Sequence, residues 1–197
     1  LHARAACDKF RTYYHFDGWD VYRYNNFSHN TLAFDHKKQN VNGYTRIDSY
    51  GDSAGFMHLV SDLSNAYKSQ VKSCNRGIAV VDNRFVVVQD EIETLDKPTE
   101  LTWTMVTRAA VRKLNDCTLE LTEKGKKMIF KVESNQKIKL RSVPAKSSNS
   151  YDEPNDGVTL IGFETSIPAL AQARYCVKLI PRNTKAKYKI TPLKEWK

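Results

Sequence analysis

The residue types best suited to chemistry are concentrated near the start of the chain. Aromatic side chains follow one another closely before residue 25, with arginine nearby. Aromatic rings stack on the faces of pyranose sugars, so this composition suits a sugar-binding surface. It is equally typical of a segment that covers a hydrophobic core. The aromatics in question are Tyr13, Tyr14, Phe16, Trp19, Tyr22 and Tyr24.

One histidine, His29, stands in the segment Ser28-His29-Asn30-Thr31-Leu32. A neutral imidazole can bind a metal ion, but a histidine that hydrogen-bonds within a sheet is the plainer interpretation. The side chains of Asn30 and Thr31 can bond neighbouring backbone groups, and we expect them to fix the orientation of the histidine.

The charge of the chain favours anionic partners. Lys and Arg number 31 and Asp and Glu number 22, which gives a formal net charge of +9. Such a charge attracts nucleic acid, anionic membranes or acidic polysaccharides, although a solvated surface explains it as well. The basic residues form only short clusters along the chain, which argues against a nucleic-acid-binding arm. Arg23 and Arg46 are candidates to contact sulfate or carboxylate through the guanidinium fork, with surface solubility as the alternative.

The four cysteines exclude two common kinds of site. Cys7, Cys74, Cys117 and Cys176 lie far apart, and no C-x-x-C pair occurs. A zinc ribbon or a dithiol redox motif is therefore excluded. Disulfides are possible in an exported protein, but we predict isolated core thiols. The longest apolar run is too short for a membrane span, and no signal peptide is visible.

Short alternating strands separated by turn signals dominate the rest of the chain. The pattern predicts an all-β antiparallel β-sandwich with short helical turns, formed by residues 1–197 as a single domain. Residues 123–126 predict a hairpin turn, residues 144–154 predict a surface loop, and single helical turns are predicted at 61–67 and 167–173. Strands are predicted within 84–92, 101–106, 118–122, 128–132, 137–141, 158–163 and 175–179.

Several segments, in order, resemble heparinase II/III-like polysaccharide lyases over their C-terminal half. Each segment is weak alone, but the ordered set covers most of the chain. The resemblance is carried by residues 18–35, which look like the family's His-Asn-Thr-Leu strand, and by 39–41, 62–67, 76–78, 86–92, 103–107 and 154–158.

The resemblance implies an architecture in which an N-terminal helical toroid precedes antiparallel sheets, with the catalytic cleft between them. The chain begins at Leu1 rather than Met and contains nothing like the toroid, so we expect a C-terminal fragment of a larger lyase. The implied partners are an acidic polysaccharide and the chain's own N-terminal helical domain, with no nucleic acid and no membrane span. The implied location is periplasmic or secreted, in a bacterium.

The resemblance also implies a chemistry, namely β-elimination on uronate-containing glycans such as glycosaminoglycans. It makes His29 a zinc ligand in the full-length parent, together with an upstream His-x-His-x-Asp segment that is absent here. The fragment alone is therefore expected to be inactive and to hold no metal with certainty. The catalytic tyrosine is left open among Tyr13, Tyr14, Tyr22 and Tyr24.

Two other classes of function fit the same sequence. A non-catalytic carbohydrate-binding β-sandwich would use the aromatic N-terminal segment, and a structural or adhesion sandwich needs only the strand pattern. Helical residues encoded upstream of Leu1 would distinguish the lyase from both.

Overall fold

The computed structural model describes residues 18–196, and strands account for most of its regular structure. Tyr13 and Tyr14 lie outside the described residues. The elements are η1 (Gly18–Asp20), η2 (Tyr22–Tyr24), η3 (Asn26–Ser28), β1 (Leu32–Phe34), β2 (Ile47–Ser53), β3 (Phe56–Asp62), β4 (Ser73–Val81), β5 (Phe85–Glu93), β6 (Thr99–Thr107), β7 (Ala110–Asn115), β8 (Thr118–Glu123), β9 (Lys126–Ser134), β10 (Lys139–Pro144), β11 (Thr159–Ile167), β12 (Gln172–Pro181) and η4 (Leu193–Glu195).

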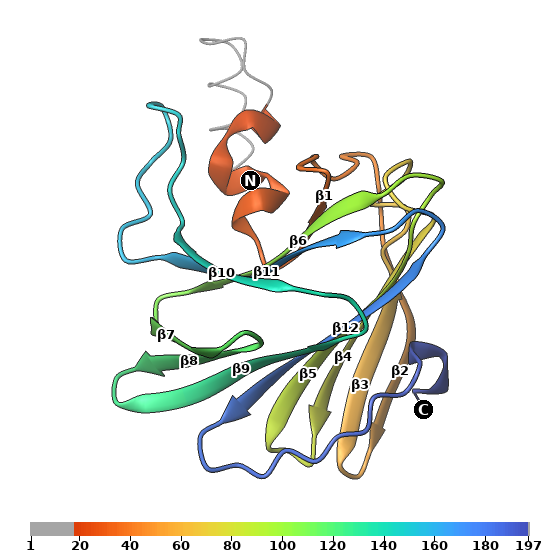
Figure 1. Ribbon diagram of the computed structural model, residues 1–197, viewed down its shortest axis with the longest axis vertical. Coiled ribbons are helices and arrows are strands. Elements are labelled where there is room, and N and C mark those ends of the chain that lie inside the picture. The colour runs from red at the N-terminus through yellow and green to blue at the C-terminus, as the bar shows by residue number, and fades with distance from the viewer. Residues whose placement is uncertain (1–17, 197) are drawn as a thin grey trace.

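The strands form two antiparallel sheets that face each other (Figure 1). The smaller sheet has the order β1-β6-β11-β10, and the larger has the order β2-β3-β4-β5-β12-β9-β8-β7. The predicted all-β antiparallel sandwich with short helical turns is confirmed. Since the central strands β6, β11, β5 and β12 each pair on both sides, alternate side chains enter the core between the sheets.

The helical turns occur at other places than predicted. Residues 61–62 end β3, and the Oδ1 of Asp62 accepts the backbone N–H of Ser64, which begins a run of tight turns instead of a helix. Near 167–173 the chain leaves β11 at Ile167, and Leu170 adopts a positive φ of 52°. Short-range polar and backbone preferences therefore outweigh the weak helical pattern at both sites.

The main core lies between the two sheets, and aromatic residues dominate it. Trp103 of β6 stacks on Phe163 of β11, with ring centroids 5.9 Å apart, and contacts Phe130 of β9 edge to face. Tyr67 and Phe34 extend this core toward the start of β1. Side chains that are fully buried here also include Leu32, Leu101, Ile161, Ile167, Tyr175 and Val177.

A second, smaller core covers the outer face of the larger sheet. The segment after β12 crosses this face (blue in Figure 1) and places Leu193 and Trp196 on Val60, Ala79 and Val87. Gly77 makes this possible, because a Cβ at that position would lie 2.3 Å from the Leu193 side chain.

The predicted hairpin and loop are both present. Lys124 and Gly125 have φ values of 48° and 76°, which suit a tight turn between β8 and β9. The chain between β10 and β11 is irregular, as predicted for 144–154. Cys74 and Cys176 are buried free thiols, as predicted, whereas Cys117 is a free thiol that is only half-buried and does not belong to the core. Among the described residues, no helix has the length and apolar character needed to cross a membrane.

Candidate functional site

The His29 motif lies in a connection between elements rather than in a strand. The turn η3 ends at Ser28, and the backbone N–H of Thr31 donates to the carbonyl of His29 at 2.9 Å, so the chain bends there. Only Leu32 is part of β1, where it pairs with Trp103. The expectation that the whole motif forms a strand is therefore wrong, because this local turn delays the start of β1.

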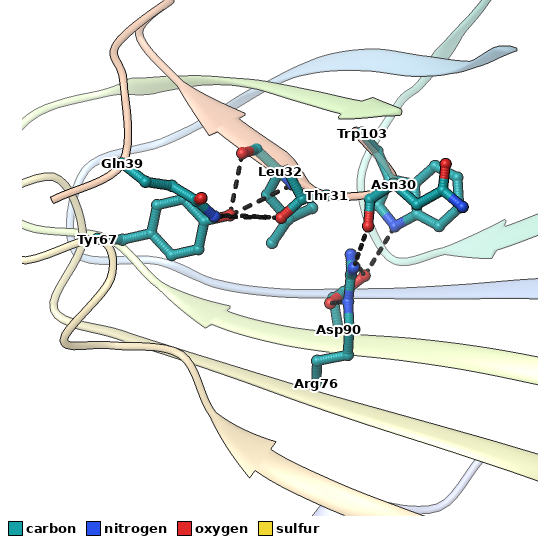
Figure 2. A network of polar contacts seen from close by, with 8 residues as sticks. All are labelled: Asn30, Thr31, Leu32, Gln39, Tyr67, Arg76, Asp90 and Trp103. Atoms are coloured by element: carbon teal, nitrogen blue, oxygen red, sulfur yellow. Dashed lines mark hydrogen bonds and ion pairs between the residues drawn. The ribbon is translucent and has the colours of Figure 1, made fainter. Parts of the chain in front are cut away.

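A buried tyrosine hydroxyl anchors the C-terminal side of the motif. The hydroxyl of Tyr67 lies 2.9 Å from the hydroxyl of Thr31, donates to the carbonyl of Leu32 at 3.0 Å and accepts from the Gln39 amide at 2.7 Å (Figure 2). Burial raises the pKa of Tyr67 to about 12, so the hydroxyl keeps its proton at physiological pH.

A buried ion pair anchors the N-terminal side. Arg76 donates to both oxygens of Asp90, at 2.7 and 3.0 Å, and Trp103 donates its indole N–H to the same carboxylate at 2.8 Å (Figure 2). Arg76 also donates to the carbonyl of Asn30 at 3.2 Å, and the Asn30 side-chain oxygen accepts the backbone N–H of Val106. The predicted orienting role of Asn30 and Thr31 thus has a structural basis.

His29 itself points outward from this rigid base. Its Nε2 lies 3.0 Å from the carbonyl oxygen of Arg23. Since a carbonyl only accepts hydrogen bonds, this contact places the proton of the neutral ring on Nε2. The lone pair on Nδ1 is then available to accept a proton or to bind a cation.

Two pockets meet at His29. The first, of about 450 Å³, is also lined by Trp19, Tyr24, Lys38 and Gln39. Trp19 and Tyr24 are 43% and 44% exposed, so their rings are accessible to a ligand. The wall of this pocket therefore combines aromatic, amide and cationic groups, which suits an acidic sugar.

The second pocket, of about 420 Å³, brings Arg23 and Arg108 beside His29. Arg23 donates from Nε to the side chain of Asn155 and from one terminal nitrogen to the carbonyl of Pro154. The loop between β10 and β11 thereby fixes this guanidinium. Both arginines place positive charge at one end of the His29 site.

The other predicted residues are not gathered at His29. Tyr22 lines a separate pocket with Arg141, and burial raises the pKa of its hydroxyl. Arg46 lies just before β2 and pairs with Asp48 at 3.2 Å, and it does not line either pocket that contains His29. Of the two predicted tyrosines that the structure describes, Tyr24 is the one that shares a pocket with His29.

Several residues of the site carried no signal in the sequence. Lys38 lies in the irregular chain after β1 and Arg108 lies between β6 and β7, and nothing in their spacing links them to His29. The ion pair between Arg76 and Asp90 joins two strands through side chains that read as ordinary strand positions. Only the fold reveals these groups, because their partners are distant in the chain.

The described residues do not form a zinc site by themselves. Structural and catalytic zinc needs at least three protein ligands. Within residues 18–196, no group of three His, Cys, Asp or Glu side chains is arranged to hold a metal ion. His29 can offer Nδ1, but the remaining ligands are not present in this part of the chain.

Comparison with known proteins identifies the fold. The sequence matches no protein-family model and no curated protein. Solved structures do match: a heparinase III gene product with methylated lysines (16% identity, TM-score 0.60, 79% of this chain and 24% of that chain) and a crystal structure of heparinase III (14% identity, TM-score 0.62, 79% and 24%). A heparan sulfate lyase from Pedobacter heparinus matches similarly (12% identity, TM-score 0.60, 81% and 25%).

The chain has a heparinase-like fold. The likeness is to the C-terminal domain side of those proteins. The resemblance seen in the sequence is confirmed at this level. The chain spans about a quarter of the length of the solved structures that it matches.

Proposed function

We propose that this chain is the C-terminal β domain of a polysaccharide lyase, which cleaves uronate-containing acidic glycans by β-elimination. It forms one wall of the substrate cleft, and an N-terminal helical domain forms the other. The observation that carries the proposal is the position of His29, which lies where two pockets with cationic residues meet. The turn that holds it is fixed by the Tyr67 hydroxyl on one side and by the Arg76–Asp90 pair on the other. A periplasmic or secreted location in a bacterium follows from the same proposal.

The site has groups that β-elimination needs. The proton at C5 of a uronate becomes removable when its carboxylate is neutralised, so the enzyme must place cationic or hydrogen-bonding donors there. Arg108 and the uncommitted nitrogen of Arg23 are donors available beside His29, whereas the ammonium group of Lys38 is paired with Asp20. A base near C5 and an acid near the leaving oxygen complete the reaction.

Tyr24 and His29 are the proton-transfer candidates on this wall of the cleft. The phenol of Tyr24 lines the same pocket as the imidazole of His29. The ring of Trp19 in that pocket offers a face on which a pyranose can stack. We assign Tyr24 the transfer of a proton at its hydroxyl oxygen. His29 has the same role at Nδ1 when that nitrogen is free, and it would hold the metal ion instead when zinc is bound there.

Zinc enters the proposal only through residues beyond 18–196. A metal-bound histidine commonly donates its other ring N–H to a carbonyl, and the contact of His29 with Arg23 has this form. Zinc, when bound, would supply positive charge near the substrate carboxylate. We assign no step to it, because the described residues do not supply its ligands. Metal analysis of the full-length protein, with and without His29→Ala, tests this part.

The function is tested on the full-length protein with heparan sulfate, chondroitin sulfate, hyaluronan and alginate. Lyase activity produces a conjugated uronate that absorbs ultraviolet light. His29→Ala and Tyr24→Phe are each expected to lower turnover by about 10²- to 10⁴-fold, the usual contribution of a proton-transfer group. Tyr50→Phe is the matched control, since Tyr50 is 83% exposed on β2 and lies away from both pockets.

Two results would contradict this proposal in different ways. Absence of the ultraviolet signal with all four glycans would refute the lyase activity. A larger loss with Tyr22→Phe than with Tyr24→Phe would move the cleft to the pocket that contains Arg141.

A non-catalytic carbohydrate-binding module is the second candidate. The exposed rings of Trp19 and Tyr24 favour it, because stacking alone needs no proton transfer. In that case Trp19→Ala would abolish glycan binding, and the full-length protein would bind all of its glycan without producing an unsaturated product.

A further inference from the structure

The positive charge of the chain is unevenly distributed. Residues 108–146 contain eleven Lys and Arg against four Asp and Glu, and residues 174–197 contain eight against one. Residues 18–107 contain nine against eleven. The two basic segments include β7, β8, β9 and β12, which are consecutive in the larger sheet. Basic residues of these four strands, which are separate in the sequence, thus come together in one half of one sheet.

The outer face of this half-sheet holds an unbalanced cluster around Glu120. The carboxylate of Glu120 contacts Arg112 at 2.9 Å, Lys127 at 3.2 Å and Arg182 at 2.5 Å. Hydrogen bonding from Arg112 is the main cause of a lowered pKa of Glu120, so it is ionised near neutral pH. One carboxylate neutralises one of the three cations. The side chains of Arg112 and Arg182 remain 67% and 51% exposed.

A second unbalanced cluster lies beside the first on the same face. Lys131 of β9 is directly opposite Lys178 of β12, although like charges at such positions destabilise a sheet. Glu133 contacts both ammonium groups, at 3.0 and 2.9 Å, and again one carboxylate serves more than one cation. The face opposite the core residue Phe130 therefore carries five cations and two carboxylates. Four of the cations are accessible, since the Lys178 side chain is only 6% exposed and lies against the ring of Tyr188.

We propose that this cationic face, whose accessible members are Arg112, Lys127, Lys131 and Arg182, is an accessory binding surface for a polyanionic glycan. It holds the sulfated or carboxylated chain outside the cleft that contains His29. The assignment of the ligand as a glycan rests on the proposed function. Guanidinium groups match sulfate and carboxylate by paired hydrogen bonds, and Arg112 and Arg182 provide such groups at two edges of the cluster.

Among residues 18–196, no strongly exposed aromatic ring lies on this face, because Tyr188, which packs against Lys178, is half-buried; this favours a glycan over single-stranded nucleic acid. Sites for single strands combine a basic groove with aromatic side chains on which bases stack. Among residues 18–196, the strongly exposed aromatic rings are Trp19, Tyr24, Tyr44 and Tyr50. None of these belongs to β7, β8, β9 or β12.

Dextran sulfate is the probe for this surface, because it has no uronate and β-elimination cannot cleave it. The double variant Arg112→Gln/Lys127→Gln removes two charges and leaves Arg182 to neutralise Glu120. Binding of the full-length protein is expected to weaken about three- to ten-fold, as for the loss of two exposed ion pairs, and to lose part of its salt dependence. The control Lys72→Gln/Arg84→Gln removes the same charge beside β4 and in the turn between β4 and β5, and binding is expected to stay within two-fold.

Equal weakening by both double variants would overturn the proposal, since net charge alone would then explain binding. Tighter binding of a single-stranded oligonucleotide than of dextran sulfate at equal salt would overturn the glycan assignment. This binding test does not depend on lyase turnover. If the full-length protein shows no lyase activity, but Arg112→Gln/Lys127→Gln weakens dextran sulfate binding and the control does not, the binding surface is supported and only the lyase activity is refuted.

Discussion

Two charge clusters lie on opposite faces of the same eight-stranded sheet, and they differ in balance and in burial. On the inner face, Arg76 and Asp90 pair one to one, with side chains 11% and 0% exposed. On the outer face, Glu120 serves three cations that remain open to solvent. The two clusters therefore use similar residues for different purposes.

The inner pair is enclosed and committed to protein partners. Three donors occupy the carboxylate of Asp90, and Arg76 gives a further N–H to the carbonyl of Asn30. Burial disfavours the charged guanidinium, but Asp90 more than compensates, so the pKa of Arg76 lies above its ordinary value. A balanced, enclosed pair of this kind positions the backbone beside His29. The outer cluster keeps accessible cations and can attract an anion.

The largest predicted effect is on the inner pair. Asp90→Ala would leave Arg76 as a buried, unpaired cation and the indole N–H of Trp103 without its acceptor. We expect the free energy of unfolding to fall by about 3–5 kcal/mol, measured by urea denaturation. Asp52→Ala, at an exposed position of β2, is expected to change it by less than about 0.5 kcal/mol. A loss below about 1 kcal/mol for Asp90→Ala would show that the inner pair is not an anchor.

A smaller effect is predicted for the neutral anchor on the other side of the motif. Tyr67→Phe removes the hydroxyl that joins Thr31, Leu32 and Gln39. Thr31 and Gln39 would still bond each other at 3.2 Å, but the buried backbone of Leu32 would lose its shortest side-chain partner. The expected loss is about 1–3 kcal/mol by urea denaturation.

Tyr175→Phe is the matched control for this substitution. Tyr175 is as deeply buried in the same core, and its hydroxyl makes no hydrogen bond of normal geometry within residues 18–196, although the side chain of Thr165 lies near it. Its removal is expected to be neutral or slightly stabilising. Equal losses in the two variants would mean that packing, and not the polar network, accounts for the role of Tyr67.

The strands of the fold were predictable because local patterns determine them. Alternation identified β6, β8, β9 and β12, and the charged turn with Gly125 identified the hairpin between β8 and β9. The sequence pattern did not predict β2 and β3. β2 is exposed along nearly its whole length, so it shows no apolar alternation. The order of the strands could not be predicted either, because β1 pairs with β6, and β5 with β12, across long stretches of chain.

The candidate site was predictable only in part, for the same reason. His29 and Tyr24 lie in one short segment, so composition and family resemblance were enough to select them. The contacts that hold the motif are long-range: Asn30 bonds Val106, and Arg76 bonds the Asn30 carbonyl. Such contacts cannot be predicted from spacing in the sequence, because the position of each partner depends on where its own strand lies in the fold.

The smallest predicted effect is on the pKa of Glu120, in the cluster on the outer face of the sheet. The pKa of Glu120 is lowered in the folded protein, so its contribution to stability is present above the ordinary carboxyl pKa and is lost as pH falls through the lowered value. Arg112→Gln removes the main cause of that shift. The pKa of Glu120 should then rise toward, but not reach, its ordinary value, because Lys127 and Arg182 remain in contact. Titration of the carboxyl carbon by NMR measures this, and the urea midpoint near neutral pH should hardly move. An unchanged pKa of Glu120 would mean that the exposed Arg112 side chain spends little time in contact with Glu120. The cations of the outer face would then be more mobile than the enclosed Arg76 of the inner pair.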